Sequence, residues 1–358
     1  MKCFFSYIVL YYFSNYEPNK IISLNTQIDI LENEILERYP DVLEILLSDQ
    51  TKKKNILWST NNYQHLGQLY YSEKEITLKL ITGSNGDVIM PRVQKDKTLQ
   101  QTRARDMAEV FTPSWICNSQ NNLIDNTWFC KENTFNEEIK LTDGSWSWKV
   151  NPKKIVYPKN KTWKDYIRDR RLEIACGEAP YITSRYDTTT GAFIPVNERI
   201  GILDRKLRVI NENVNTSGKW LKAAQIAFMS TYAYEWQGDS LLLAREAMMF
   251  TFIENYRLKF SKEPLLKSIK YIAYIISWNV WQMDGIKGVI PNSCREIDKF
   301  EINLFDENKT TRIKCEGCEK DNIKKHNGTY CLVKKWSNID KTTGRKGEKI
   351  RYIDLLNN

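Results

Sequence analysis

The clearest hydrophobic pattern lies in the middle of the chain, where short apolar runs alternate with longer stretches at helical spacing. Leu172–Ala175 and Thr231–Glu235 have the length and composition of buried strands. Apolar side chains three or four positions apart predict helices in three neighbouring stretches, at residues 219–230, 240–256 and 265–276. Strands that alternate with helices are typical of an open sheet in the α/β class. The sequence therefore predicts an α/β fold for this region.

The surrounding segments have less regular patterns. Residues 18–48 predict a helical stretch that Pro40 interrupts, and residues 94–106 predict a linker or an exposed helix. Residues 55–93 contain runs such as NILWS and ITLKLI, which predict short strands. The TTTG tetrapeptide predicts a hairpin, and the segment after it, residues 199–210, predicts another strand.

The length of 358 residues allows two or three domains, at about 100–200 residues each. Hydrophobic residues make up 42% and charged residues 27%, which excludes a largely disordered or fibrous chain. We expect an N-terminal α/β segment at 1–105, a central domain at 106–300 and a small basic module at 301–358.

The net charge and the length of the apolar runs limit the possible partners of the protein and the compartments in which it works. The net charge is 53 − 44 = +9, which together with 11 Trp and 19 Tyr is consistent with a polyanionic partner. The longest apolar run, Phe4–Phe13, is shorter than the roughly 18 residues of a membrane helix, and no small-x-small cleavage site follows it. We expect a buried first element or an over-extended start there, no membrane partner and a cytoplasmic location. Eight cysteines in a chain of this length are consistent with a reducing compartment.

Candidate ligand-binding residues follow the strands of the central domain. In open α/β sheets, ligands bind at the carboxyl ends of the strands, where a glycine turn allows close approach to the backbone. Cys176 and Gly177 follow the first strand, Glu235 ends the next, and Asp284 follows the run SWNVWQM. A carboxylate in the position of Glu235 typically binds ribose hydroxyls, and Asp284 could accept a hydrogen bond from an adenine amine. Alternatively, Glu235 is a solvated surface carboxylate and Asp284-Gly285 a plain turn.

Three motifs occur in an order that resembles a known enzyme family. They are AEVFTPSW at 108–115, LEIACGEAP at 172–180, and YEWQ at 234–237 followed by LARE at 243–246. These segments are similar to motifs of the amino-type (γ-class) N6-adenine DNA methyltransferases, in particular the group described as restriction endonuclease subunit M. The resemblance covers roughly residues 85–290.

The resemblance implies a Rossmann-like core that binds S-adenosylmethionine and methylates adenine in double-stranded DNA, as part of a restriction–modification system. The first motif would lie near the methionine moiety, the glycine turn beneath it, and the two later acids on the ribose and the adenine. The implied cofactor-binding residues are Phe111, Thr112, Pro113, Cys176, Gly177, Glu178, Glu235 and Asp284.

The sequence also departs from this family. The interval from Gly177 to Glu235 is 235 − 177 = 58 residues, which indicates an insertion around YDTTTG. The catalytic tetrapeptide of the family, Asp or Asn followed by Pro-Pro and an aromatic residue, does not occur in the sequence. The chain could therefore be the cofactor-binding portion of an enzyme, with the catalytic motif or a nuclease on a second chain. Alternatively, it is an inactive DNA-binding or scaffold subunit, or a Rossmann-like enzyme with another nucleotide cofactor.

The C-terminal module contains a separate motif with metal-ligand spacing. Cys315, Cys318, His326 and Cys331 follow the pattern C-x2-C-x7-H-x4-C. Thiolates and one imidazole suit tetrahedral zinc, and four protein ligands indicate a structural ion in a zinc-ribbon- or knuckle-like module. Lysines flank the motif and could contact phosphates. The alternative is a basic hairpin with reduced cysteines.

Overall fold

A parallel sheet of three short strands organises the structure, a computed structural model that describes residues 32–107, 109, 112–301, 309–339 and 346–356. The strands are β5 (Arg171–Ile174), β6 (Thr231–Glu235) and β7 (Val280–Gln282), and they lie in the order β5-β6-β7. The molecule is thus a mixed α/β protein with small sheets, and the strands predicted at 172–175 and 231–235 are present. The predicted burial of the first is wrong, because Leu172 and Ile174 of β5 are exposed.

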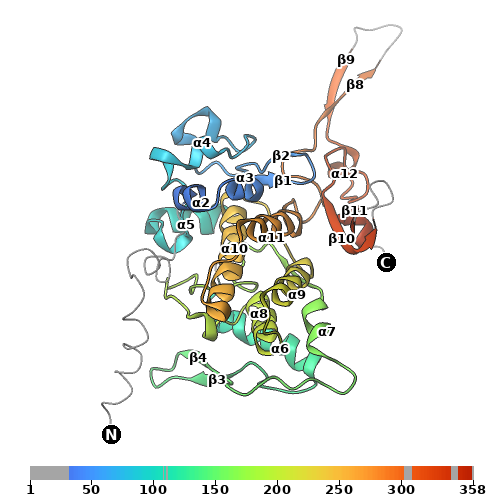
Figure 1. Cartoon of the computed structure of the whole chain (residues 1–358). Helices are drawn as coiled ribbons and strands as arrows, with labels where there is room; N and C mark the ends of the chain where they lie inside the picture. Colours follow the sequence, from blue (N-terminus) through green and yellow to red (C-terminus); the bar gives the residue numbers. More distant parts are fainter. Residues whose placement is uncertain (1–31, 108, 110–111, 302–308, 340–345, 357–358) are drawn as a thin grey trace.

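Helices form both connections between the parallel strands, because a parallel pair needs a crossover of a dozen or more residues. α8 (Ile202–Asn213) and α9 (Ser217–Met229) connect β5 to β6. α10 (Gly238–Phe260) and α11 (Leu266–Asn279) connect β6 to β7, and Figure 1 shows α10 passing through the middle of the molecule. Every residue from Gly238 to Tyr256 is buried. The helices predicted at 219–230, 240–256 and 265–276 are confirmed.

The strand predicted at residues 199–210 is wrong, because this segment is helix α8. Its β-branched residues favoured a strand, but Leu203, Leu207 and Ile210 recur at helical spacing and all are fully buried. The hairpin predicted at TTTG is present in short form, with an antiparallel bridge between Tyr186 and Phe193.

The described part of the N-terminal region, from residue 32, is mostly irregular, and the predicted helical residues 18–31 lie outside the described residues. The helical stretch is interrupted near Pro40, as predicted, and Asp41 has a left-handed backbone with φ 65°. The short strands predicted at 55–93 are largely wrong, since apart from the end of the two-residue strand β2 only single helical turns form there. The elements are α2 (Glu32–Arg38), α3 (Val42–Leu47), β1 (Ser48–Asp49), β2 (Lys54–Asn55), η2 (Gln64–Leu66), η3 (Gln68–Tyr70), α4 (Leu78–Ile81), η4 (Gly83–Asn85), η5 (Arg92–Gln94) and α5 (Lys97–Met107).

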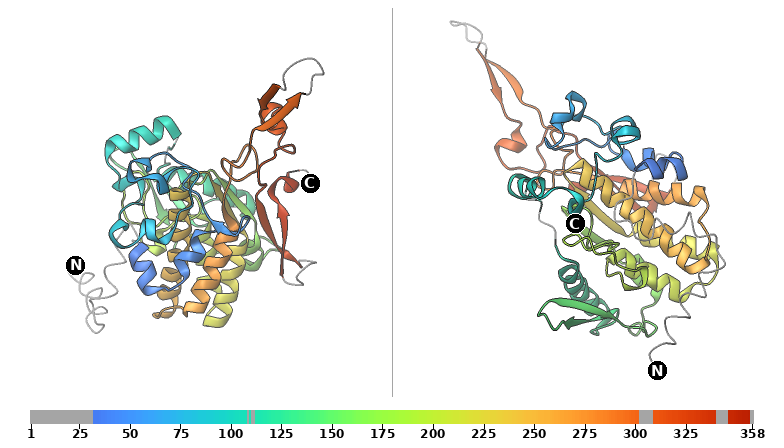
Figure 2. Two further views of the ribbon diagram at one scale, coloured as in Figure 1. Left: turned by 90° about the horizontal axis from the view of Figure 1, so that it is seen from above. Right: turned by 90° about the vertical axis from the view of Figure 1, so that its left-hand side faces the viewer.

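Two further regions complete the chain. Helices and a hairpin precede the parallel sheet: α6 (Ser114–Phe129), β3 (Asn136–Lys140), β4 (Trp146–Val150) and α7 (Trp163–Arg168), with η6 (Val196–Glu198) following β5. The C-terminal region contains β8 (Ile297–Glu301), β9 (Lys309–Ile313), α12 (Glu316–Glu319), β10 (Leu332–Ile339), β11 (Lys346–Arg351) and η7 (Tyr352–Leu355). Figure 2 shows the β8–β9 hairpin projecting away from the body in both views.

The hydrophobic core is continuous across the boundary predicted near residue 105. Buried side chains of the N-terminal region, such as Leu43 and Trp58, belong to the same cluster as Leu242 and Ile276 of the crossover helices. A second, smaller cluster joins Trp281 and Met283 to Cys331 and Val333, so the β10–β11 hairpin packs against the sheet. No helix among the described residues is long and apolar enough to cross a membrane.

Candidate cofactor cavity and metal centre

A cavity of about 450 Å³ opens at the carboxyl ends of β5 and β6. Four of the predicted cofactor residues line it, although they are far apart in the sequence. The parallel pairing of β5 with β6 brings the two strand ends to one edge of the sheet, as the α/β interpretation requires. The four residues are Thr112, Cys176, Gly177 and Glu235.

Glu235 is a buried carboxylate that holds the turn after β5. The backbone N–H of Gly177 donates to its Oε2 at 2.8 Å, and the N–H of Gln237 donates to its Oε1 at 3.1 Å. Gly177 has φ 53°, a left-handed conformation that favours glycine. Burial raises the pKa of Glu235, while the N–H bonds from Gln237 and Gly177 oppose this shift. The alternative that Glu235 is a solvated surface carboxylate is wrong, because only 7% of the residue is exposed.

A second buried carboxylate, Glu173, lines the same cavity and was not predicted. Its Oε1 accepts from the backbone N–H of Tyr181 at 3.4 Å, whereas its Oε2 has no hydrogen-bond partner within the part of the chain that is described. Burial raises the pKa of Glu173 to about 8, and the nearby charge of Glu235 adds to the rise. The one signal in the sequence is an acidic residue within the apolar run of β5.

The side chains that line the cavity are acidic or neutral. Glu109 is the third carboxylate in its wall. Its Oε2 forms an ion pair with the guanidinium of Arg103 at 2.5 Å, and Arg103 itself does not line the cavity. Among the described residues that line the cavity, none is Lys, Arg or His. Such a wall stabilises a cation and repels phosphate groups.

The other predicted cofactor residues that the structure describes do not line this cavity. Phe111 lies outside the described residues. Pro113 precedes the first turn of α6. Glu178 is buried, and its two oxygens accept from the N–H of Arg92 at 2.7 Å and the hydroxyl of Tyr186 at 2.6 Å. In the structure it connects neighbouring loops, and a contact of Glu178 with the cofactor stays a prediction.

Asp284 forms a turn, the alternative that the sequence also allowed. Its Oδ1 accepts from the N–H groups of Ile286 and Lys287, both at 3.1 Å, and its Oδ2 pairs with the Lys287 ammonium at 3.4 Å. It lines a separate cavity of about 390 Å³ next to Trp236 and Cys294. The structure therefore does not bring Asp284 together with Glu235 in one cavity.

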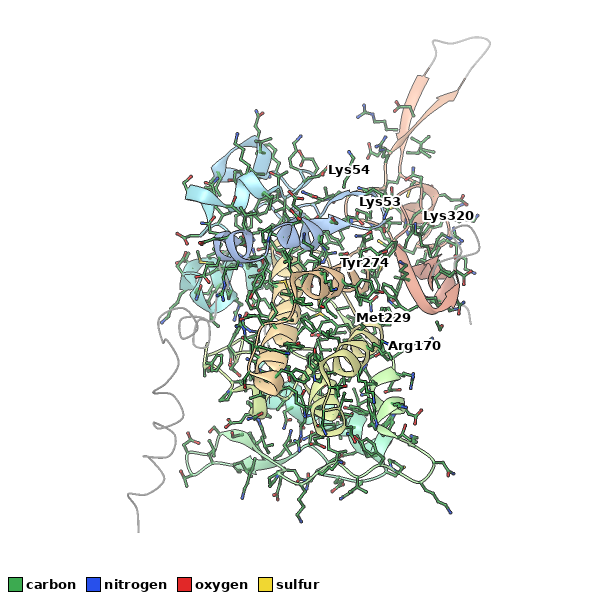
Figure 3. The ribbon with its side chains drawn as sticks, in the orientation of Figure 1. Lys53, Lys54, Arg170, Met229, Tyr274 and Lys320 are labelled. Carbon is green, nitrogen blue, oxygen red and sulfur yellow. The ribbon has the colours of Figure 1, made fainter. Side chains whose placement is uncertain are left out.

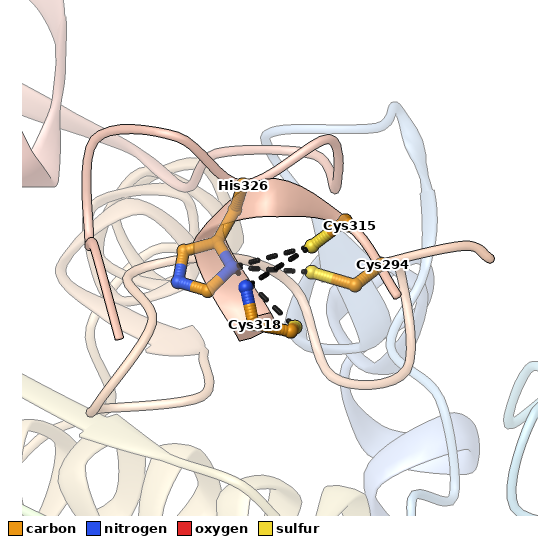
Figure 4. Close-up of side chains that lie close together, drawn as sticks. All are labelled: Cys294, Cys315, Cys318 and His326. Carbon is orange, nitrogen blue, oxygen red and sulfur yellow. Dashed lines mark hydrogen bonds between the residues drawn. The ribbon is translucent and has the colours of Figure 1, made fainter. Parts of the chain in front are cut away.

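Four potential metal ligands converge in the C-terminal region. One ligand atom from each of Cys294, Cys315, Cys318 and His326 lies within 4.8 Å of the other three. The three sulfurs are 3.6, 3.7 and 3.6 Å from Nδ1 of His326 (Figure 4). Tetrahedral zinc, with bonds of about 2.0–2.3 Å, separates its ligands by roughly 3.5–3.8 Å. The cluster can therefore hold a metal ion such as zinc.

Local structure explains why two of the cysteines meet. Cys315 is the N-cap of α12, and its sulfur accepts from the backbone N–H of Cys318 at 3.4 Å. Gly317 lies between them and against the His326 ring, where an added Cβ would approach Nδ1 to 2.6 Å. A side chain at this position would displace the histidine from the cluster.

The fourth member of the cluster is Cys294 and not the predicted Cys331. Backbone bridges fix this outcome, because Tyr330 pairs with Val289 and the N–H of Cys331 donates to Gly288 at 3.0 Å. This pairing turns Cys331 into the core, where its thiol donates to the carbonyl of Gln282 at 3.3 Å. Cys294 follows β7, 21 residues before Cys315 (315 − 294), and so lies outside the spacing that the motif suggested.

Comparisons with known proteins assign no family. No family model matches the chain, and neither the curated proteins nor the solved structures give a significant match. The function is therefore inferred from the chemistry of two sites, the acidic cavity at the ends of β5 and β6 and the Cys3His cluster after β7.

Proposed function

We propose that the chain binds S-adenosylmethionine in the acidic cavity and is the cofactor-binding portion of an adenine-N6 DNA methyltransferase with a Rossmann-like core. The observation that carries this proposal is the acidic lining of the cavity, with three carboxyl groups and no cationic side chain among the described lining residues. S-adenosylmethionine bears a sulfonium and an ammonium group, so it complements such a wall. Dinucleotides and nucleoside phosphates bring negative charge, which these carboxylates repel.

Each lining residue has a role that its geometry supports. Glu235 accepts two N–H groups and keeps lone pairs for ribose hydroxyls, because an ionised carboxylate can accept about four hydrogen bonds. Oε2 of Glu173 has no hydrogen-bond partner among the described residues and would accept from the ammonium group. Gly177 would let the cofactor approach the backbone closely. The volume of about 450 Å³ is within the usual range of small-molecule sites.

Zinc in the Cys3His cluster would be structural, because four protein ligands leave no open position for a substrate or water. The ion would fasten the loop after β7, through Cys294, to the segment around α12. The net charge of +9 supports the double-stranded DNA partner, with a restriction–modification system as the setting. A second function, an inactive DNA-binding or scaffold subunit, is favoured by the absence of the Pro-Pro-aromatic tetrapeptide from the sequence.

The purified chain alone is expected to transfer no methyl group to DNA. The adenine amine is a weak nucleophile, and the tetrapeptide that accepts its hydrogen bonds and stacks on the flipped base is missing from this sequence. Incorporation of tritiated methyl groups into DNA measures this directly. Turnover typical of methyltransferases would show that another residue of this chain polarises the amine.

Glu235→Ala is expected to weaken the binding of S-adenosylmethionine at least tenfold. Charge-assisted hydrogen bonds contribute about 1.5–3 kcal/mol each, and about 1.4 kcal/mol corresponds to a tenfold change in Kd. Isothermal titration calorimetry gives the Kd, and Glu132→Ala, at an exposed position, is the matched control. An unchanged Kd in a folded Glu235→Ala variant would contradict the ribose assignment.

Binding of S-adenosylmethionine at pH 7 is expected to release a proton from Glu173. Burial raises the pKa of Glu173 to about 8, so its carboxyl group is mostly protonated at pH 7 in the free protein. A bound ammonium favours the carboxylate, and affinity should therefore rise as the pH increases from 6 to about 8. Calorimetry in buffers of different ionisation enthalpy counts the released protons. Glu173→Gln should abolish the release, and an equal release in that variant would exclude Glu173 as its source.

A further inference from the structure

A second and larger cavity, of about 730 Å³, opens as a groove on one face of the parallel sheet. Leu172 of β5 and Tyr232 of β6 form its floor, and α9 and the β10–β11 hairpin form its walls. Arg170 and Met229, both labelled in Figure 3, are among its lining residues. The groove and the cofactor cavity are separate, and among the described residues they share one lining residue, Leu172.

The groove marks a part of the sheet that no described element covers. Parallel sheets normally have both faces covered by other elements. Here the β10–β11 hairpin covers β7, so Trp281 is only 5% exposed, whereas Leu172 of β5, in the groove, is 45% exposed. β5 is also an edge strand that pairs with β6 alone among the described strands. An exposed apolar residue on an edge strand, beside other apolar lining residues, indicates a surface for another polypeptide.

The rim of the groove is strongly basic. No Asp or Glu is found among the described residues that line it, but six cationic residues are: Arg168, Arg170, Arg171, Lys222, Lys334 and Lys335. Arg171 pairs with Asp125 and Asp169. Within the described chain, Arg168, Arg170, Lys222 and Lys335 form no ion pair with a carboxylate. The occupant of the groove should therefore carry negative charge.

We propose that an acidic amphipathic helix of a partner polypeptide docks in this groove. Its apolar side would cover Leu172 and Met229, and its carboxylates would meet the basic rim. A helix is the usual layer on the face of a parallel sheet. A nucleic acid strand would also meet the basic rim and rings such as Tyr271 and Trp336, so the test includes a labelled DNA oligonucleotide. The aliphatic part of the lining, which includes Ile226 and Val333, favours the apolar side of a helix. The inference goes beyond the proposed function and does not depend on cofactor binding.

The test uses the full chain and a labelled model peptide of about 18 residues, with leucines on one helical face and glutamates elsewhere. Fluorescence anisotropy should show saturable binding of this peptide and none of a matched peptide with lysines in place of glutamates. Arg170→Glu combined with Lys335→Glu should weaken binding at least tenfold, because attraction becomes repulsion. Met229→Asp should also weaken it, whereas Lys159→Glu, at an exposed position outside the groove, should leave it unchanged.

Three results would overturn the proposal. They are a lack of saturable binding by the glutamate peptide, an equal loss with Lys159→Glu, or loss in the groove variants only for a labelled DNA oligonucleotide. Calorimetry with S-adenosylmethionine should give the same Kd for the groove variants as for the unmodified chain. If the cofactor fails to bind while the peptide binds as described, the proposed function fails and the docking surface stands.

Discussion

Replacement of Cys294 by Ser is expected to release zinc from the C-terminal region, whereas replacement of Cys331 by Ala should leave the metal content unchanged. Cys294 belongs to the cluster in which all four ligand atoms lie within 4.8 Å of one another. Cys331 is fully buried in the core beside β7 and donates to Gln282. The pair of variants therefore separates the ligand set seen in the structure from the set that the sequence spacing suggested.

The effect on folding should be large and local. Zinc ligation contributes about 10–16 kcal/mol in small zinc modules, far more than the few apolar side chains around α12 can supply. Cys294→Ser, or a chelator, should make the chain protease-sensitive in the segment after β9, while the crossover helices stay protected. Elemental analysis and limited proteolysis measure the two effects. Less than about half an equivalent of zinc in the unmodified chain, with this segment still protected, would mean that packing holds it instead.

The sequence predicted the parallel sheet and its helices because their patterns are periodic. β6 alternates buried and half-buried residues, and the apolar residues of α11 recur at three-four spacing. α10 is buried on all sides, and its length distinguishes it from a strand. These signals are local, so a single sequence is enough to reveal them.

The wrong predictions concern features that depend on contacts between residues far apart in the sequence. Residues 55–93 contain strand-like runs, but they fold into short turns that pack on the shared core through residues such as Trp58 and Ile76. Cys294 joins the cluster through a long-range approach of the loop after β7, which a spacing motif cannot show. In the sequence, Glu173 looks like any acidic residue in a strand. Only the structure shows that it lines the cavity and that its Oε2 has no hydrogen-bond partner among the described residues.

The sequence also does not show which charged side chains are buried. In the structure, a buried ion-pair cluster connects the N-terminal region to helix α10. Asp239, in the first turn of α10, is completely buried. Its carboxylate pairs with Arg103 at 2.9 Å and with Lys95 at 3.5 Å, and it accepts the hydroxyl of Tyr63 at 2.8 Å. All three partners precede residue 105, so this cluster crosses the predicted domain boundary. These buried ion pairs help to explain why one hydrophobic core contains residues from before and after residue 105.

Asp239→Asn is therefore expected to lower the free energy of unfolding at pH 7 by about 3–5 kcal/mol, the usual cost of leaving a buried cation without its partner. Glu109 still neutralises part of the charge of Arg103, which places the effect near the lower end of this range. Urea denaturation followed by circular dichroism measures it. Asp87→Asn, at an exposed position, should leave the denaturation curve in place.

The free energies of unfolding of the unmodified chain and of Asp239→Asn should depend differently on pH in the acid range. The positive charges of Arg103 and Lys95 overcome the effect of burial and hold the pKa of Asp239 well below its usual value. A carboxyl group with a lowered folded-state pKa stabilises the fold above its unfolded-state pKa of about 3.9, and this contribution is lost as the pH falls toward the folded-state value. The difference in stability between the unmodified chain and Asp239→Asn should therefore be constant from pH 7 to about 5 and shrink below pH 4. A difference that stays the same at pH 3 would show that the ionised carboxylate is not what holds the N-terminal region against α10.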